Sequence, residues 1–245
     1  MGRNATSRRT ILMIAGFGDN SSMFDGLRDT ALADACDLLP FDMPGFGAPR
    51  LEGVTTIDAL ASTVAREADR TGATILLAHS VASIIASVAL GKSALLDTIL
   101  SVEGNITAED AYFSGTAADY DDPLAFRAAF LDRLEKMAEG SQVIARYRDN
   151  VARADPTALW ELGRDARRFS EAKHPGECLV AAGKVSYLYD SPNCPASTLD
   201  WLRSHPIDKR LLAGASHWPS VDTPALLASR CIEALDALSD TSGRR

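Results

Sequence analysis

Positive charge is in short supply in this sequence. Its 245 residues include 25 lysines and arginines against 33 aspartates and glutamates, which gives a net charge of −8 at pH 7. No stripe rich in lysine or arginine interrupts this acidic background. Because net negative charge repels a phosphate backbone, we expect no nucleic-acid partner.

Cysteine is also scarce, and its spacing excludes a disulfide framework. The chain has four cysteines with no C-x-x-C pair among them, namely Cys36, Cys178, Cys194 and Cys231. In a chain of this length such scattered cysteines are typical of buried free thiols. We therefore expect a reducing, cytoplasmic environment and no bound metal ion.

A third absence is that of a long apolar run. The longest one, residues 75–91, contains His79 and three serines and is shorter than a membrane span. The residues before Ile11 are too polar for a signal peptide. With 46% hydrophobic and 24% charged residues, the composition is that of a globular protein without membrane contact. Its length suits one α/β domain, or a core domain with an insertion.

The stretch ATILLAHSVASIIASVALGK, residues 73–92, predicts a buried parallel strand that passes almost directly into a buried helix. So sharp a turn requires small residues on both sides of it, and the chain supplies Ala78 and Ala82. Ser80 lies at the centre of the turn. Its hydroxyl either caps the helix or acts as a nucleophile.

Short apolar runs elsewhere predict further strands, with helical patterns between them. The strand candidates are residues 10–15, 37–42, 73–78, 97–102, 184–190 and 208–213. The helix candidates outside residues 106–176 are residues 20–34, 55–70, 197–204 and 224–238, together with the helix after Ser80. Strands that alternate with helices indicate an α/β fold with a parallel sheet.

Residues 106–176 differ from the rest because they contain no buried-strand run. They consist of charged helical segments whose aromatic residues lie mostly at the spacing of a helix core. This composition is typical of a helical cap inserted into an α/β core. We therefore divide the chain into residues 1–105 as the first part of the core, residues 106–176 as the cap, and residues 177–245 as the second part of the core.

Three segments resemble motifs of the α/β-hydrolase family. The sequence A-H-S-V-A around Ser80 is similar to the nucleophile elbow G-x-S-x-G, with alanine in place of each glycine. D-M-P-G-F-G, which begins at Asp42, is similar to the family's D-x-P-G-x-G turn, in which this aspartate organises the turn. G-A-S-H-W-P, which begins at Gly214, is similar to the family's G-x-G-H-W-P.

The resemblance covers the chain from Ile11 to Leu238 outside the cap. It implies the α/β-hydrolase fold, a mostly parallel sheet of about six strands with helices on both faces and an inserted helical cap. It also implies a serine hydrolase in which Ser80 is the nucleophile and His217 is the base. The backbone N–H groups of Phe17 and Val81 would form the oxyanion hole.

Two carboxylates at strand ends compete for the third position of the triad. Glu103 ends the strand after the nucleophile helix, where haloalkane dehalogenases and some relatives carry their acid. Asp190 ends the next strand, near the place that most of the family uses, but the usual G-x-x-D spacing is missing there. We favour Glu103 and keep Asp190 as the alternative. The other histidines, His79, His174 and His205, are expected to be exposed or to have structural partners, with His79 facing away from the nucleophile.

The expected substrate is a small-molecule ester, lactone, thioester or amide, with no cofactor. A dinucleotide is not expected because the third glycine position after Gly16-Phe17-Gly18 is Ser21. Carbon–carbon bond hydrolysis and cofactor-independent oxygenation remain open on the same residues, and so does a homo-oligomer. The alternative from another class is a non-catalytic protein that binds a small ligand, which the alanines at positions 15, 78 and 82 favour.

Overall fold

The computed structural model describes residues 8–240. Six strands form one sheet in the order β2-β1-β5-β6-β7-β8, and every neighbouring pair is parallel. The strands are β1 (Arg9–Ile14), β2 (Cys36–Phe41), β5 (Ile75–His79), β6 (Thr98–Val102), β7 (Lys184–Tyr189) and β8 (Asp208–Leu211). A small separate sheet pairs β3 (Met43–Pro44) with β4 (Gly47–Ala48). The predicted α/β class and six-stranded parallel sheet are confirmed.

The central strands are more deeply buried than the edge strands. Every residue of β5 and β6 is buried, which agrees with their continuous apolar sequences, and these two strands occupy the middle of the sheet. The edge strand β2 contains Pro40, which lacks the N–H that a central strand needs. At the other edge, burial alternates along β8.

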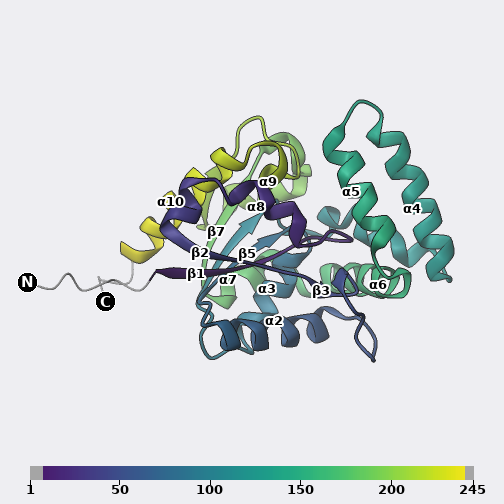
Figure 1. Ribbon diagram of the computed structural model, residues 1–245, viewed down its shortest axis with the longest axis horizontal. Coiled ribbons are helices and arrows are strands. Elements are labelled where there is room, and N and C mark those ends of the chain that lie inside the picture. The colour runs from purple at the N-terminus through teal and green to yellow at the C-terminus, as the bar shows by residue number, and fades with distance from the viewer. Residues whose placement is uncertain (1–7, 241–245) are drawn as a thin grey trace, which may run out of the picture.

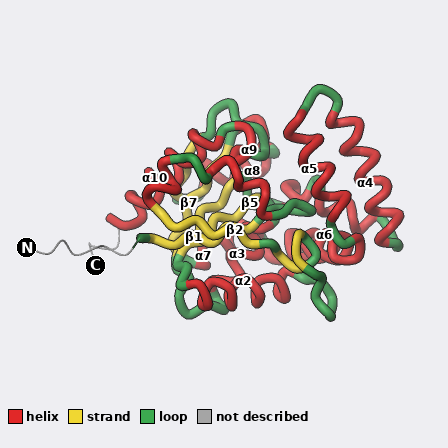
Figure 2. The backbone as a smooth tube through the Cα atoms, viewed as in Figure 1, coloured by secondary structure: helices red, strands yellow, loops and turns green. Residues whose placement is uncertain are grey.

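Helices cover both faces of the sheet (Figures 1 and 2). One face carries α2 (Ile57–Thr71), α3 (Ala82–Leu90) and α7 (Pro175–Ala182). The other carries α1 (Ala31–Ala35) and α10 (Pro224–Asp240), which pack on each other. The remaining core helices are α8 (Ala196–Ser204) and α9 (Pro219–Asp222). No helix within residues 8–240 is long and apolar enough to cross a membrane.

The expected single helix over residues 20–34 is wrong. The structure has a 3-10 helix, η1 (Ser21–Leu27), followed by the short α1. Packing accounts for the difference, because Gly26 lies so close to α9 that a Cβ atom there would be 2.7 Å from the Ser220 carbonyl oxygen. The Asp42 carboxylate accepts a hydrogen bond from the Ser21 N–H at 2.8 Å, so Asp42 ties η1 to the turn after β2, in keeping with its expected structural role.

All four cysteines are free thiols, as predicted. Cys36 and Cys231 are buried, whereas Cys178 and Cys194 are only partly buried.

The segment between β6 and α7 contains three long helices that project from one end of the sheet (Figure 1). They are α4 (Pro123–Ala138), α5 (Gln142–Arg153) and α6 (Pro156–Lys173), preceded by the short 3-10 helices η2 (Ala108–Ala111) and η3 (Ser114–Asp119). The Gly176 N–H donates to the Ile106 carbonyl at 2.8 Å, so the segment leaves and rejoins the core at one point. The boundary expected after residue 176 falls inside α7, which packs against α3 of the core.

The strand order also indicates where a ligand can bind. The chain moves from β1 to β2 on one side and then crosses to β5 on the other side of β1. Such a reversal opens a crevice at the carboxyl ends of β1 and β5, which is where ligands bind in open α/β sheets. The loops that leave these two ends contain Phe17 and Ser80.

Candidate active site

Ser80 occupies the sharp turn between β5 and α3. Its φ angle is +54°, in the left-handed region that residues other than glycine rarely adopt. The Ser80 N–H donates to the Val102 carbonyl of β6 at 2.9 Å, which helps to hold this conformation. Strained backbone of this kind gathers at functional sites, so the turn resembles a nucleophile elbow in geometry as well as in sequence.

The loop after β1 passes directly beside this turn. A Cβ atom at Gly16 would lie 2.9 Å from the Ser80 Cβ and 2.7 Å from the His79 Nδ1, so only glycine fits there. Ala78 and Ala82 are fully buried. The elbow thus tolerates alanine at both of its flanking positions, while the close approach to the neighbouring loop needs glycine at position 16.

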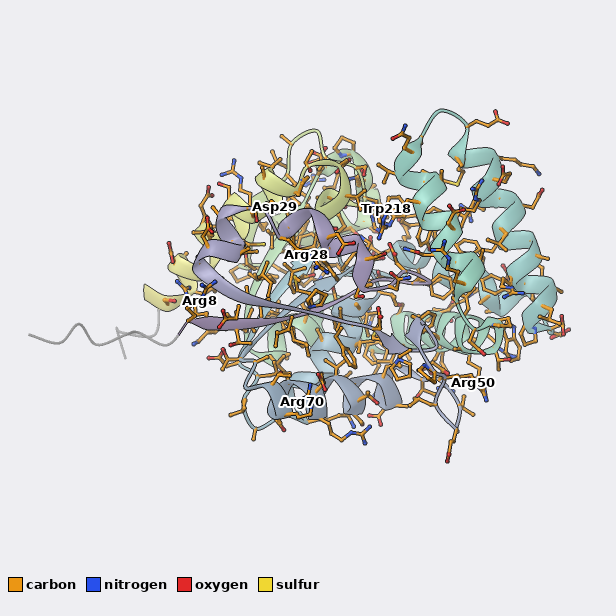
Figure 3. The ribbon with its side chains drawn as sticks, in the orientation of Figure 1. Arg8, Arg28, Asp29, Arg50, Arg70 and Trp218 are labelled. Atoms are coloured by element: carbon orange, nitrogen blue, oxygen red, sulfur yellow. The ribbon has the colours of Figure 1, made fainter. Side chains whose placement is uncertain are left out.

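His217 lies on the loop after β8 and lines the same cavity as Ser80. Its Nδ1 atom is 3.8 Å from the Glu103 Oε2 and 3.5 Å from the Tyr112 hydroxyl. The following residue, Trp218, is buried on the side of the core that faces the cap (Figure 3). Nδ1 is therefore the His217 ring nitrogen that lies near both the Glu103 carboxylate and the Tyr112 hydroxyl.

The two competing carboxylates have different partners. Glu103 follows β6 with a φ of +49°, and its side chain is only 2% exposed. Its Oε1 accepts hydrogen bonds from the Asp190 N–H at 2.7 Å and from the Asn193 side-chain amide at 3.2 Å, while its Oε2 faces His217. The Asp190 carboxylate instead accepts the Gly214 N–H at 2.9 Å. Geometry therefore pairs His217 with Glu103 and leaves Asp190 to hold the loop that carries His217.

His79 has a structural partner, as expected, and that partner is the loop that carries His217. Its Nε2 is 2.7 Å from the His217 carbonyl oxygen, and the two imidazole rings pack edge to face with centroids 4.9 Å apart. Burial lowers the pKa of His79 to about 3, so the ring is neutral and Nε2 carries the proton that it donates to this carbonyl. His79 is thus a structural partner of the His217 loop.

Of the two predicted oxyanion-hole residues, Phe17 lines the cavity that contains Ser80, and Val81 follows Ser80 in the chain. Among residues 8–240, the backbone N–H groups of Phe17 and Val81 donate to no protein acceptor, so both are free to bind a ligand oxygen. The Phe17 ring packs against Phe126 and Phe130 of α4, with centroids 6.2 and 5.7 Å apart. The loop after β1 is thus packed against α4 of the cap.

Helix α5 of the cap also binds this loop through hydrogen bonds. The Tyr147 hydroxyl donates to the Phe17 carbonyl at 2.6 Å. The buried Asp19 carboxylate accepts from the Asn150 side-chain amide at 2.7 Å and pairs with Arg146 at 3.3 Å. Burial raises the pKa of Asp19, and the nearby Arg146 charge opposes that rise. Sequence reasoning did not identify Asp19 or its partners Arg146 and Asn150, because these two residues are 127 and 131 positions away from it along the chain.

The cavity at Ser80 is small and enclosed by aromatic side chains. Its lining includes Phe17, Tyr112, Phe113, Tyr147 and Trp218 around the polar residues. The volume open to a water-sized sphere is about 10 Å³, which is room for about one water molecule. Among residues 8–240, no group of three His, Cys, Asp or Glu side chains is arranged to hold a metal ion.

Comparison with known proteins shows the family. The model of a family described as "Alpha/beta hydrolase family" matches residues 11–230. No curated protein sequence matches the chain.

Several solved structures share the fold. An esterase from Thermogutta terrifontis superposes with a TM-score of 0.73 at 19% identity, over 94% of this chain and 90% of that one. An enol-lactonase from Burkholderia xenovorans LB400 gives 0.70 at 16% identity, over 96% and 94%. A variant of AqdC, described as recognising the Pseudomonas quinolone signal and cleaving its ring, gives 0.74 at 18% identity, over 94% and 92%. At such identities the likeness shows the fold.

Proposed function

The chain belongs to the α/β-hydrolase family, and from this premise we propose that it is a serine hydrolase acting on a small-molecule ester or lactone, with thioesters and amides as further substrates of the same chemistry. One observation carries the proposal. Ser80 stands in a left-handed elbow in the same cavity as His217, and His217 has the buried Glu103 carboxylate behind it. The esterase and the enol-lactonase that share the fold support this substrate class.

Each residue has a definite part in the reaction. The His217 Nε2 removes the Ser80 proton as the Ser80 oxygen attacks the substrate carbonyl carbon. Glu103 stabilises the imidazolium that forms, and it holds the ring with Nδ1 protonated. The Phe17 and Val81 N–H groups bind the oxyanion of the tetrahedral intermediate. His217 then gives the proton to the leaving alcohol, which leaves an acyl-serine.

Water completes the cycle by the same steps. Once the ester bond is broken and the alcohol has left, or in a lactone has swung aside on its acyl chain, water enters the cavity, gives a proton to His217 and attacks the acyl carbon. The acid product leaves and Ser80 recovers its proton. The aromatic lining of the cavity favours an apolar group next to the reacting carbonyl.

Labelling with a fluorophosphonate tests the proposal, because this probe reacts with activated serines. We expect the native protein to be labelled and the Ser80→Ala variant to be unlabelled. Ser87→Ala is the matched control, since Ser87 is a serine of α3 whose hydroxyl bonds to the Ile84 carbonyl of its own helix at 2.8 Å. Hydrolysis of p-nitrophenyl butyrate and of a γ-lactone should follow the same pattern.

Other outcomes identify the competing functions. No labelling at any pH between 6 and 9 and no hydrolysis would contradict the proposal and favour a ligand-binding protein. Oxygen consumption with an aromatic substrate that survives Ser80→Ala would favour cofactor-independent oxygenation.

A further inference from the structure

A second and larger cavity lies where the cap meets the core. It has a volume of about 570 Å³, within the range typical of small-molecule sites. Three arginines from different parts of the chain line it, namely Arg50 after β4, Arg127 on α4 and Arg153 at the end of α5. Arg50 is at the side of the molecule where the core loop approaches α6 (Figure 3). We call this cavity the arginine cleft.

The positive charge in the arginine cleft is poorly compensated. Among residues 8–240, Arg127 and Arg153 have no carboxylate within 4 Å, and the Arg50 guanidinium has only Glu161, at 3.7 Å. Asp155 is the one acidic residue in the lining, and its carboxylate caps α6 by accepting the Ala158 N–H at 2.9 Å. Three like charges therefore share one cavity in a chain whose net charge is −8.

The hydrogen-bonding capacity of these arginines is also largely unused. A guanidinium has several N–H donors and no acceptor. Arg127 makes one long bond, of 3.5 Å, to the Ala154 carbonyl, and Arg153 makes one of 3.4 Å to the Asn150 side chain. The Nη1 atom of Arg50 has no hydrogen-bond partner, and the nearest carboxylate to it is that of Glu161, at 3.7 Å. Arg127 and Arg153 therefore supply the donors that are free to bind an acceptor from outside the chain.

We propose that the arginine cleft binds a small organic anion through a carboxylate or phosphate group. Guanidinium groups bind both groups through paired, charge-assisted hydrogen bonds. The cleft is separate from the active-site cavity, since the two share no lining residue. The loop after β1 is their common wall, with Phe17 and Asp19 on the active-site side and Gly18 and Asn20 on the side of the cleft.

Asn150 connects the two sides of this wall. It lines the arginine cleft, accepts a hydrogen bond from Arg153 there, and donates to the Asp19 carboxylate on the active-site side. The bound anion therefore lies next to the contacts that fix the oxyanion loop, without touching Ser80.

Calorimetric titration with inorganic phosphate and with succinate tests the proposal, with the ionic strength held constant by KCl. The Ser80→Ala protein is used alongside the wild type, so that binding is measured independently of any hydrolytic activity. We expect at least one of the two anions to bind both proteins equally. Binding of phosphate alone identifies a phosphoryl ligand, and binding of succinate alone identifies a carboxylate ligand.

Charge-removing variants locate the binding. The double variant Arg127→Gln/Arg153→Gln should bind the anion more weakly, with a Kd raised by about tenfold or more. Arg66→Gln is the matched control, because Arg66 is exposed on α2 and has no carboxylate partner among the described residues. It should leave the Kd unchanged. If the double variant does not fold, as judged by thermal unfolding, Arg153→Gln alone is used, since Arg153 is exposed.

Three results would overturn the proposal. These are no binding of either anion to the wild type, an equal Kd in the wild type and the cleft variants, and an effect of Arg66→Gln as large as that of the double variant. Loss of binding after fluorophosphonate labelling would also overturn it, because the anion would then occupy the active-site cavity.

Discussion

The core and the cap contribute to the active site by different physical means. The core supplies the proposed reacting side chains, and backbone hydrogen bonds to neighbouring strands hold two of them, Ser80 and Glu103. Ser80 is held to Val102, and Glu103 is held to the Leu188 carbonyl at 2.8 Å. The cap supplies side-chain contacts, such as that of Tyr147 with the loop after β1. Under the proposed mechanism, the core would determine the chemistry, and the cap would position the loop after β1.

From this difference we expect substitutions in the core and in the cap to lower turnover to different extents. Removal of a reacting group from the core should abolish turnover, since no neighbouring group replaces it. Removal of one cap contact should only weaken turnover, because Phe126, Phe130 and Asn150 still hold the same loop. The predictions below test this ranking, from the largest expected effect to the smallest.

The largest effect is expected for Ser80→Ala. Loss of the nucleophile should lower kcat for p-nitrophenyl butyrate by about 10⁵- to 10⁶-fold, as in other serine hydrolases. Ser87→Ala should stay within about threefold of the wild type, because it loses only one hydroxyl bond inside α3. A Ser80→Ala protein that retained a tenth of wild-type turnover would remove the nucleophile from the mechanism.

Glu103→Gln and Asp190→Asn compare the two carboxylates. Glu103→Gln removes the charge that stabilises the His217 imidazolium, so kcat should fall by about 10³- to 10⁴-fold. Asp190→Asn keeps an oxygen that can accept the Gly214 N–H, so its kcat should fall by less than about tenfold. Steady-state kinetics of both variants decides between them. The reverse order of effects would identify Asp190 as the acid.

Because burial lowers the pKa of His79, we expect the stability of the protein to depend on pH. Its pKa is about 3 in the folded state against about 6.5 in the unfolded state, so between these values only the unfolded chain takes up the proton. Acidification through this window therefore destabilises the fold. From pH 7 to pH 5, His79 accounts for a loss of about 2 kcal/mol in the free energy of unfolding.

Urea unfolding of the wild type and of His79→Gln at both pH values measures this contribution. Glutamine can still donate to the His217 carbonyl but does not titrate, so the variant should lose about 2 kcal/mol less on acidification. An equal loss in both proteins would show that His79 does not stay neutral in the fold.

The smallest effect is expected in the cap. Tyr147→Phe removes the hydroxyl that binds the Phe17 carbonyl, so the oxyanion loop should be less well placed and kcat should fall by about tenfold with little change in KM. Tyr120→Phe is the control, because Tyr120 is a cap residue outside the active-site cavity. A Tyr147→Phe effect as large as that of Glu103→Gln would place the cap among the determinants of the chemistry.

The sequence predicted the central strands well because they are short, largely apolar and fully buried segments. β5 and β6 begin and end within two residues of the expected positions. The sharp turn at Ser80 could also be predicted from the sequence, since a turn between adjacent elements depends on a few neighbouring side chains. The helix expected over residues 20–34 failed because contact with Ser220, almost 200 positions away, determines that segment.

The acid of the proposed triad could be predicted only in part. Both Glu103 and Asp190 end strands, so the sequence narrowed the choice to two residues. The hydrogen bond of Asp190 to Gly214 and the approach of Glu103 to His217 distinguish them in space.

From the sequence alone we could predict the α/β class and the parallel strands, and could identify Ser80 and His217 as candidate site residues. Local patterns of apolar residues and turn residues encode these features. Only the tertiary structure decided which carboxylate faces His217, how Tyr147 and Asn150 hold the loop after β1, and where Arg50, Arg127 and Arg153 meet. Each of those arrangements joins side chains from distant parts of the chain. Their contact depends on how the cap packs against the core, which no short segment specifies.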